Sequence, residues 1–382
     1  MQNFEFCVPT RIIFGRGKEE TIGEVLKNDG IKKVLMVYGS HSIKKNGLYK
    51  KVTKSLKESG IAFAEYSGIK SNPRVSDVDK AAELARNEDV DAILGVGGGS
   101  VMDSVKGISA AAKCNCNVWD FYTQKAEIND AFPIYNIVTL AATASEMNSG
   151  FVLTNEETSE KLGNGSPLLY PKVSILNPEL TFTVPKDYTA YGAVDIIAHV
   201  LEGYLTRTSG PDLMNMYIES IIKTVIKTTE IILKNPEDYD ARAEFMWSAT
   251  LALNGSAKTG MDGISFPNHM VEHGISAISD IAHGAGLSIV IPAWMKWYKS
   301  KNEDQFKRFA KEIFGKDTID DGIKSLEDWF RSIESPVRLI DAGITDETLP
   351  DITLKSHKQA LKWGIDKEYS AEAISEILQF AK

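Results

Sequence analysis

Short apolar runs alternate with helical patterns through the first half of the chain. The apolar runs that predict strands cover residues 32–38, 61–66, 91–96 and 132–139. The patterns that predict helices lie between them, at 48–59, 75–87 and 101–112. Alternation at this spacing is typical of βαβ units and a parallel sheet, and continuously apolar strands fit burial on both faces. We therefore expect an α/β, Rossmann-like domain.

From about residue 183 the pattern becomes helical and remains so toward the end. Pro185 is typical of a first helical turn, and turns containing Gly or Pro separate several later segments. The expected helices span 186–206, 211–233, 237–255, 267–278, 284–299, 303–313, 319–333 and 370–381. Since 382 residues exceed one ordinary core, we expect an α/β domain over residues 1–182 and an all-α domain over residues 183–382.

Composition narrows the class of protein. Apolar residues make up 43% and charged residues 25%, as in globular proteins. A net charge of −9 argues against nucleic acid and anionic membranes as partners. No apolar run approaches the roughly 20 residues of a membrane span, and the N-terminus lacks the features of a signal peptide. The three cysteines, Cys7, Cys114 and Cys116, form no disulfide framework. We expect a cytoplasmic protein.

Histidines gather in two segments of the helical half. Four of the six in the chain lie in Asp195-Ile-Ile-Ala-His199 and in the run from His269 through His273 to His283. Residues i and i+4 share a helix face, with Cβ atoms about 5–6 Å apart, which suits ligands of one cation. A mixed set of Asp and His favours a divalent first-row metal such as Fe²⁺ or Zn²⁺. A single histidine on an apolar face is more often a core residue, so the prediction rests on the combination.

A glycine-rich turn predicts a nucleotide site. Gly97-Gly98-Gly99-Ser100 follows a buried-type strand and opens a helix that contains Asp103. Glycines let the backbone approach a phosphate, and the helix N-terminus offers free N–H groups. The turn is neither a P-loop nor a clean G-x-G-x-x-G. A tight structural turn is the alternative, which the neighbouring βαβ units make less attractive.

Two further loops bear on which nucleotide binds. The strand ending at Tyr38 leads into Gly39-Ser40-His41-Ser42, with two lysines following and no acidic residue that would grip a ribose 2′-OH. This loop favours a 2′-phosphate and hence NADP(H), with a solvated polar turn as the alternative. The hydroxyl-rich segment 139–147 could hold phosphate and the nicotinamide carboxamide, or simply cap a helix.

The combination resembles the iron-containing, or group III, alcohol dehydrogenases, and within them the NADPH-dependent butanol dehydrogenase and aldehyde reductase branch. The resemblance covers nearly the whole chain and is carried by residues 6–17, 37–47, 97–103 and 139–147, by Asp195-x3-His199, and by His269-x3-His273-x9-His283-Gly. Two departures matter. The branch commonly has Gly-Gly-Gly-Ser where this chain has Gly39-Ser-His-Ser42, and residues 334–369 match poorly and stay unassigned.

The resemblance assigns roles to individual positions. It implies four metal ligands: Asp195, His199, His269 and His283. It implies that His273 lies near the nicotinamide without binding the metal, and that Gly39 stands where relatives that prefer NAD carry an Asp. The cofactor-binding positions that it implies are Gly39, Ser40, Ser42, Asn72, Gly97, Gly98, Gly99, Ser100, Asp103, Thr139, Leu140, Thr143, Val152 and Lys161.

The activity that follows is reversible hydride transfer between NADP(H) and a small primary alcohol or its aldehyde, such as butanol and butyraldehyde. The resemblance further implies Fe²⁺ or Zn²⁺ as the metal, an α/β dinucleotide-binding domain followed by a helical metal-binding domain, and a homodimer. Two rivals remain. One is a Zn²⁺-dependent polyol dehydrogenase similar to glycerol dehydrogenases. The other is a regulatory protein that binds metal and nucleotide without turnover, against which the complete ligand set with His273 argues.

Overall fold

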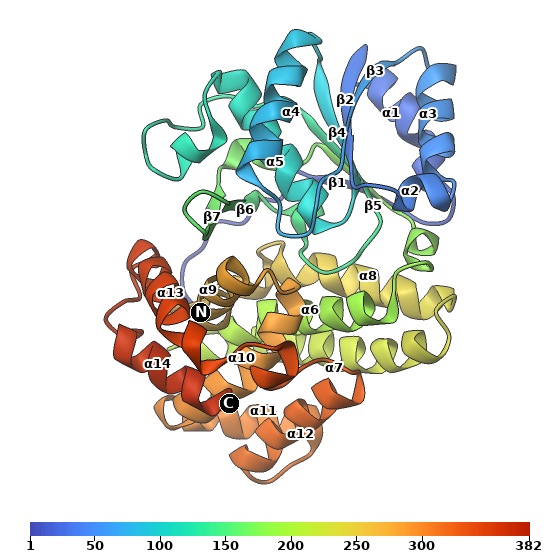
Figure 1. Ribbon diagram of the computed structural model, residues 1–382. Coiled ribbons are helices and arrows are strands. Elements are labelled where there is room, and N and C mark those ends of the chain that lie inside the picture. Colours follow the sequence, from blue (N-terminus) through green and yellow to red (C-terminus); the bar gives the residue numbers. More distant parts are fainter. The chain divides into compact units, whose positions relative to one another are not determined.

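Six parallel strands form the central sheet of the structure, a computed structural model that describes residues 1–382 (Figure 1). The strands follow the order β1-β8-β5-β4-β2-β3. Their bounds are β1 Arg11–Phe14, β2 Lys33–Tyr38, β3 Ala62–Ser67, β4 Ala92–Gly97, β5 Ile134–Val138 and β8 Val173–Leu176. The predicted parallel sheet is confirmed. The sequence pattern missed β1 and β8, which have only four residues each.

Helices cover both faces of this sheet. Alternate side chains of β2 enter different cores: Leu35 and Val37 pack with α4 (Val75–Asn87) and α5 (Gly99–Cys114), whereas Val34 and Met36 pack with α1 (Ile22–Asn28) and α3 (Leu48–Glu58). Because both faces are dry, the central strands are apolar at almost every position, as the sequence indicated. The edge strands β1 and β3 have exposed positions, which explains their weaker pattern.

The α/β unit consists of residues Cys7–Val184 together with Glu237–Thr250. The added segment is most of α8 (Tyr239–Leu253), which packs its Trp247 ring edge against Phe14 and donates a 2.5 Å hydrogen bond from Thr250 Oγ1 to Glu146. The unit also contains α2 (Ser42–Lys45) and an antiparallel hairpin of β6 (Gly150–Asn155) and β7 (Glu160–Gly165). Most of α8 is therefore part of the α/β unit, although it follows α6 and α7 in the sequence.

The helical unit consists of residues Met1–Phe6, Pro185–Pro236 and Leu251–Lys382. Its helices are α6 Lys186–Thr206, α7 Asp212–Lys234, α9 Pro267–Ser279, α10 His283–Tyr298, α11 Glu303–Phe314, α12 Ile319–Ser332, α13 Leu349–Trp363 and α14 Ala371–Phe380. Helix α10 is the centre, because it is buried almost all round and packs against α6, α9, α12 and α14. None of the helices has the combination of length and apolar character that crossing a membrane requires.

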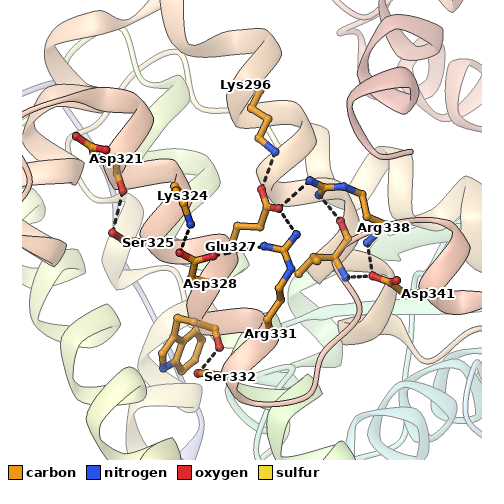
Figure 2. Close-up of polar contacts among 12 residues, drawn as sticks. Lys296, Asp321, Lys324, Ser325, Glu327, Asp328, Arg331, Ser332, Arg338 and Asp341 are labelled. Carbon is orange, nitrogen blue, oxygen red and sulfur yellow. Dashed lines mark hydrogen bonds and ion pairs between the residues drawn. The ribbon is translucent and has the colours of Figure 1, made fainter.

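An ion-pair network anchors part of the segment that the sequence left unassigned (Figure 2). Glu327 of α12 is 5% exposed and receives three cationic side chains: Lys296 at 2.6 Å, Arg331 at 2.5 Å and Arg338 at 2.8 Å. Burial alone would raise the pKa of Glu327, but Lys296 and Arg331 outweigh it and hold the pKa below its ordinary value. The carboxylate therefore stays charged and links α10, α12 and the turn that follows α12.

Helix α10 approaches the backbone of α6 closely at Gly284, the second residue of α10. A Cβ atom there would lie 2.1 Å from the backbone oxygen of Tyr191, so only glycine permits this contact. Gly203, which lies on α6, has room for a side chain, since a Cβ atom there would meet Ile264 at an ordinary 3.6 Å. The crossing of the two helices thus depends on Gly284 and not on every glycine of the pair.

We expect Gly284→Ala to lower the free energy of unfolding by about 1–3 kcal/mol, because the helices must separate. Gly203→Ala is the matched control and should leave stability unchanged or raise it by about 0.5–1 kcal/mol, as alanine favours a helix over glycine. Urea unfolding followed by circular dichroism measures both. Equal midpoints for the two variants would show that the contact at Gly284 does not constrain the fold.

Candidate metal centre and cofactor site

Three helices bring four predicted ligands to one point. Asp195 and His199 lie one turn apart on α6, His269 is on α9, and His283 is the first residue of α10. The Oδ1 atom of Asp195 lies 3.4 Å from His199 Nε2 and 3.6 Å from the Nε2 atoms of both His269 and His283. These distances exceed those of hydrogen bonds. They match donor atoms that surround one ion tetrahedrally at about 2.0–2.2 Å, which lie roughly 3.3–3.6 Å apart.

The burial of the ligand atoms also indicates a metal site. Asp195, His199 and His269 are each at most 7% exposed, and Asp195 Oδ1 and His269 Nε2 have no hydrogen-bond partner. A buried polar atom without a partner costs about 1–3 kcal/mol, a cost that a bound cation removes. Burial lowers the pKa of His199 to about 3, so its imidazole is neutral, as metal binding requires. The donor set therefore fits a divalent ion.

Two carboxylates that the sequence analysis missed lie behind this cluster. Glu202 and Glu272 are both fully buried, and they accept hydrogen bonds from Nδ1 of His269 and of His283. Burial disfavours a charge on His269, but Glu202 outweighs it and raises the pKa of that imidazole to about 10. A bound metal ion would take the place of this proton. The sequence did contain a signal for the two glutamates, namely their spacing from predicted ligands. Glu202 follows His199 by three residues, and Glu272 follows His269 by three residues.

His273 lies beside the cluster without joining the three imidazole nitrogens around Asp195 Oδ1. It is 4% exposed, and its ring centroid is 6.5 Å from that of His269 and 5.8 Å from that of His283. The edge of Trp363, at the end of α13, packs against the His273 ring at 5.8 Å. This tryptophan comes from the unassigned segment 334–369, so sequence reasoning gave no hint of its place. Phe266 packs in the same manner against His269.

In the α/β unit, the glycine-rich turn joins β4 to α5 as predicted. A Cβ atom on Gly99 would lie 2.4 Å from Thr143, and one on Gly98 would lie 3.0 Å from Leu140. Thr139 N also donates to Gly97 O at 3.0 Å. The structure thus brings the turn together with the three predicted positions Thr139, Leu140 and Thr143. No side chain caps α5, so its N-terminal amides remain suited to an anion such as a pyrophosphate.

Asp103 and Lys106, both on α5, hold the neighbouring segment in place by hydrogen bonds. Both oxygens of Asp103 bind the protein, because they accept from Ser145 Oγ at 2.7 Å and Val152 N at 3.0 Å. Lys106, fully buried and not foreseen from the sequence, donates to three acceptors on the same segment: Ser145 Oγ at 2.8 Å, Asn148 Oδ1 at 2.9 Å and Gly150 O at 2.7 Å. Burial lowers the pKa of Lys106 to about 8. Asp103 therefore shapes the site through hydrogen bonds of both its oxygens.

The other predicted cofactor positions lie on neighbouring backbone. Asn72 precedes Pro73, whose oxygen accepts a 2.8 Å hydrogen bond from Thr154 N on β6, and Thr154 pairs with Lys161 on β7. Gly39, Ser40 and Ser42 follow β2, which pairs with β4, so they share the carboxyl edge of the sheet with the glycine-rich turn. Ligands of open α/β sheets bind at that edge. Ser40 and Ser42 are exposed, and a Cβ atom on Gly39 would have ordinary room.

Comparison with known proteins agrees with this arrangement. One family model, iron-containing alcohol dehydrogenase, matches residues 9–178, and the C-terminal model of the Fe-containing alcohol dehydrogenase family matches residues 189–381. The probable NADH-dependent butanol dehydrogenase 1 of Bacillus subtilis is 42% identical over 99% of each chain. The NADPH-dependent aldehyde reductase YqhD of Escherichia coli is 33% identical over 94% of each. The NADH-dependent butanol dehydrogenase A of Thermotoga maritima, a crystal structure, has a TM-score of 0.96 at 46% identity and covers 100% of this chain and 99% of its own.

These matches identify an oxidoreductase of alcohols and aldehydes, with the α/β fold and helical half that the sequence predicted. The chain belongs to the iron-containing alcohol dehydrogenase family. Membership implies iron, a nicotinamide cofactor and small-molecule alcohols or aldehydes as substrates.

We expect His269→Ala or His283→Ala to remove most bound metal and nearly all activity, because a four-ligand site loses charge and geometry with any one ligand. His357→Ala, which removes a half-buried histidine of α13 outside the cluster, is the control and should keep both. Metal content is measured by elemental analysis after gel filtration. Stoichiometric metal in both cluster variants would contradict the assignment.

Proposed function

We propose that the chain transfers a hydride reversibly between NADP(H) and a small primary alcohol or aldehyde, of the butanol and butyraldehyde type. The observation that carries the proposal is the convergence of three imidazole Nε2 atoms on Asp195 Oδ1 within 3.6 Å. Asp195, His199, His269 and His283 would hold Fe²⁺, or Zn²⁺ in its place. An ion held there supplies a Lewis acid that stabilises alkoxide character on the substrate oxygen.

The side chains around the cluster supply the rest of the chemistry. Three neutral imidazoles and one carboxylate leave a divalent ion with a net charge near +1. The side chain of His283 is 25% exposed, against 4–9% for the other three ligands, so the substrate would approach on its side. Phe266 and Trp363 supply apolar walls beside His269 and His273. They would exclude water from the reacting atoms and accept the alkyl chain of the substrate.

His273 is the candidate proton carrier. Its ring packs against those of His283 and Trp363, and it lies one helical turn from the proposed ligand His269. An imidazole titrates near neutrality, so it can take the hydroxyl proton when an alcohol is oxidised and give a proton to the carbonyl oxygen when an aldehyde is reduced. The role is supported by this position and by the ligand set, which already has four donor atoms, Asp195 Oδ1 and three imidazole nitrogens, without His273.

We expect His273→Ala to keep its metal and to lose kcat by roughly 10²-fold or more, because proton transfer by a positioned group contributes about 10²–10⁴-fold. The pH dependence of alcohol oxidation should also change, since the group that carries the proton is removed. The comparison with His269→Ala is decisive. If His273→Ala loses metal as completely as that variant, then His273 is a ligand and one of the four assignments is wrong.

The preference for NADP(H) rests on the loop after β2. Residues 39–47 contain no carboxylate, and Lys44 lies over the rings of Tyr38 and Tyr49, at 5.3 and 5.1 Å. The nearby Glu65 accepts hydrogen bonds from both tyrosine hydroxyls. The loop itself would offer a 2′-phosphate the hydroxyls of Ser40 and Ser42 and two lysines. The relatives differ among themselves, since the B. subtilis protein is named NADH-dependent and the E. coli protein NADPH-dependent.

We expect a higher kcat/KM with NADPH than with NADH, and Gly39→Asp to reverse or erase the difference. A carboxylate at that turn would face the 2′-phosphate and cost on the order of 1–3 kcal/mol by repulsion of like charges. Gly39→Asn is the control, because asparagine has the size of aspartate without its charge. This variant should keep the preference for NADPH. A parent enzyme that uses NADH equally well or better would overturn the cofactor proposal and favour NADH.

One experiment tests the function as a whole. The protein is reconstituted with Fe²⁺ without oxygen, and NADPH oxidation is followed with unbranched C2–C6 aldehydes. Oxidation of glycerol-type polyols is followed with NADP⁺. Turnover of the aldehydes supports the proposal, activity confined to polyols favours a polyol dehydrogenase, and no turnover of any substrate favours a regulatory protein.

We also propose a homodimer in the cytoplasm. The dimer is supported only by the family resemblance, and the location by three cysteines that form no disulfide. Light scattering after gel filtration and fractionation of the host cell test the two points.

A further inference from the structure

Two fully buried carboxylates stand on the far side of the imidazole cluster. Glu202 Oε2 accepts from His269 Nδ1, and Glu272 Oε2 accepts from His283 Nδ1. In both histidines the other ring nitrogen, Nε2, faces Asp195 at 3.6 Å. The two nitrogens of an imidazole lie on different edges of the ring, so a carboxylate on Nδ1 stays outside the group of four ligand atoms.

The second oxygen of each carboxylate is also held. Glu202 Oε1 accepts from the backbone N–H groups of Asn268 and of His269, the latter at 3.1 Å, where α9 begins. Glu272 Oε1 accepts from Ser276 Oγ. An ionised carboxylate can only accept hydrogen bonds. Each of the two imidazoles must therefore carry a hydrogen on Nδ1, which leaves Nε2, directed at the common centre, as the nitrogen that can bind a metal ion.

We propose that Glu202 and Glu272 are positioning residues that fix the tautomer and ring orientation of His269 and His283, and thereby set the affinity of the centre for its metal ion. The inference rests on the metal centre of the proposed function. Carboxylates in this place also raise the basicity of the imidazole as a ligand. His199 provides a contrast within the same site, because its Nδ1 is buried without a hydrogen-bond partner.

The two hydrogen bonds link the three helices in succession. Glu202 of α6 supports the ligand of α9, and Glu272 of α9 supports the ligand of α10. Each helix thus carries a ligand of its own, and α6 and α9 also hold a ligand of the next helix. The ligand set is preorganised by the protein before an ion arrives.

The neighbouring sequence leaves room for Glu272. Gly286 lies one turn after His283 on α10, and a Cβ atom there would come within 2.8 Å of Glu272 Cγ and 3.0 Å of its Oε1. A larger residue would push the carboxylate away from His283. The glycine is therefore part of the same arrangement, which the histidine spacing alone does not reveal.

The test uses isosteric amides. Glu202→Gln has only one accepting oxygen, which can face either the backbone N–H groups or His269. In either orientation the NH₂ group faces the other donor. Keeping the helix start satisfied requires His269 to accept at Nδ1 and to carry its hydrogen on Nε2, where it opposes the metal. In Glu272→Gln, the Ser276 hydroxyl can turn and accept from the NH₂ group, so the amide oxygen still faces His283.

We expect the dissociation constant for Zn²⁺, measured by competition with a chelator, to rise about 10- to 100-fold in Glu202→Gln. The rise in Glu272→Gln should be smaller, because only the charge is lost. Glu219→Gln is the matched control: this glutamate is also in the helical unit and 4% exposed, but its partners are Tyr204 and Arg308. The control should bind Zn²⁺ as the parent does. The visible spectrum of the Co²⁺ form should change in Glu202→Gln and not in the control.

A rise below threefold in Glu202→Gln, or a larger rise in Glu272→Gln than in Glu202→Gln, overturns the inference and leaves the proposed function standing. A parent that binds no metal overturns both. Should a variant fail to fold, ¹⁵N-histidine NMR of the parent with Zn²⁺ decides the question. Three imidazoles with hydrogen on Nδ1 and metal on Nε2 are expected, those of His199, His269 and His283, and Nδ1 bound to metal in either His269 or His283 overturns the assignment.

Discussion

One carboxylate oxygen constrains the helical unit more than any other atom. Asp195 Oδ1 is buried and has three imidazoles within 3.6 Å, which come from three helices. No hydrogen bond joins this oxygen to the imidazole nitrogens that face it. Other groups must therefore hold the rings in place. Glu202 and Glu272 do so from behind, and Gly284 lets α10 begin against the backbone of α6. The central helix α10, which the other helices surround, is placed by the same contacts.

Local periodicity explains what the sequence could predict. The strands 32–38 and 91–96 are buried on both faces, and the ligand spacing in Asp195-x3-His199 follows from the helical repeat. The other two ligands, His269 and His283, were predicted from the resemblance to the family's motif. Long-range partners were beyond reach: the support of His269 by Glu202 joins residues 67 positions apart, and only packing brings Trp363 to His273. The short strands β1 and β8 gave too few residues for a pattern.

The cofactor region in the α/β unit follows another principle, in which small residues and a buried amine shape the backbone. Gly98 and Gly99 allow contact with Leu140 and Thr143, and Lys106 replaces water as the donor to three oxygens of the next segment. A glycine-rich turn is visible in a sequence because its residues are adjacent. A lysine inside an apolar helix looks like an ordinary surface residue until the acceptors around it are known.

Lys106 also bears on how the protein tolerates its own substrates. Aldehydes condense with neutral amines to give Schiff bases, and burial lowers the pKa of Lys106 to about 8, so more of its amine is neutral than that of an exposed lysine. A neutral amine of this kind would be modified readily if aldehydes could reach it. Lys106 has no exposed surface, and its nitrogen is enclosed by three acceptors. The packing that creates a reactive amine thus also shields it from the compounds that would consume it.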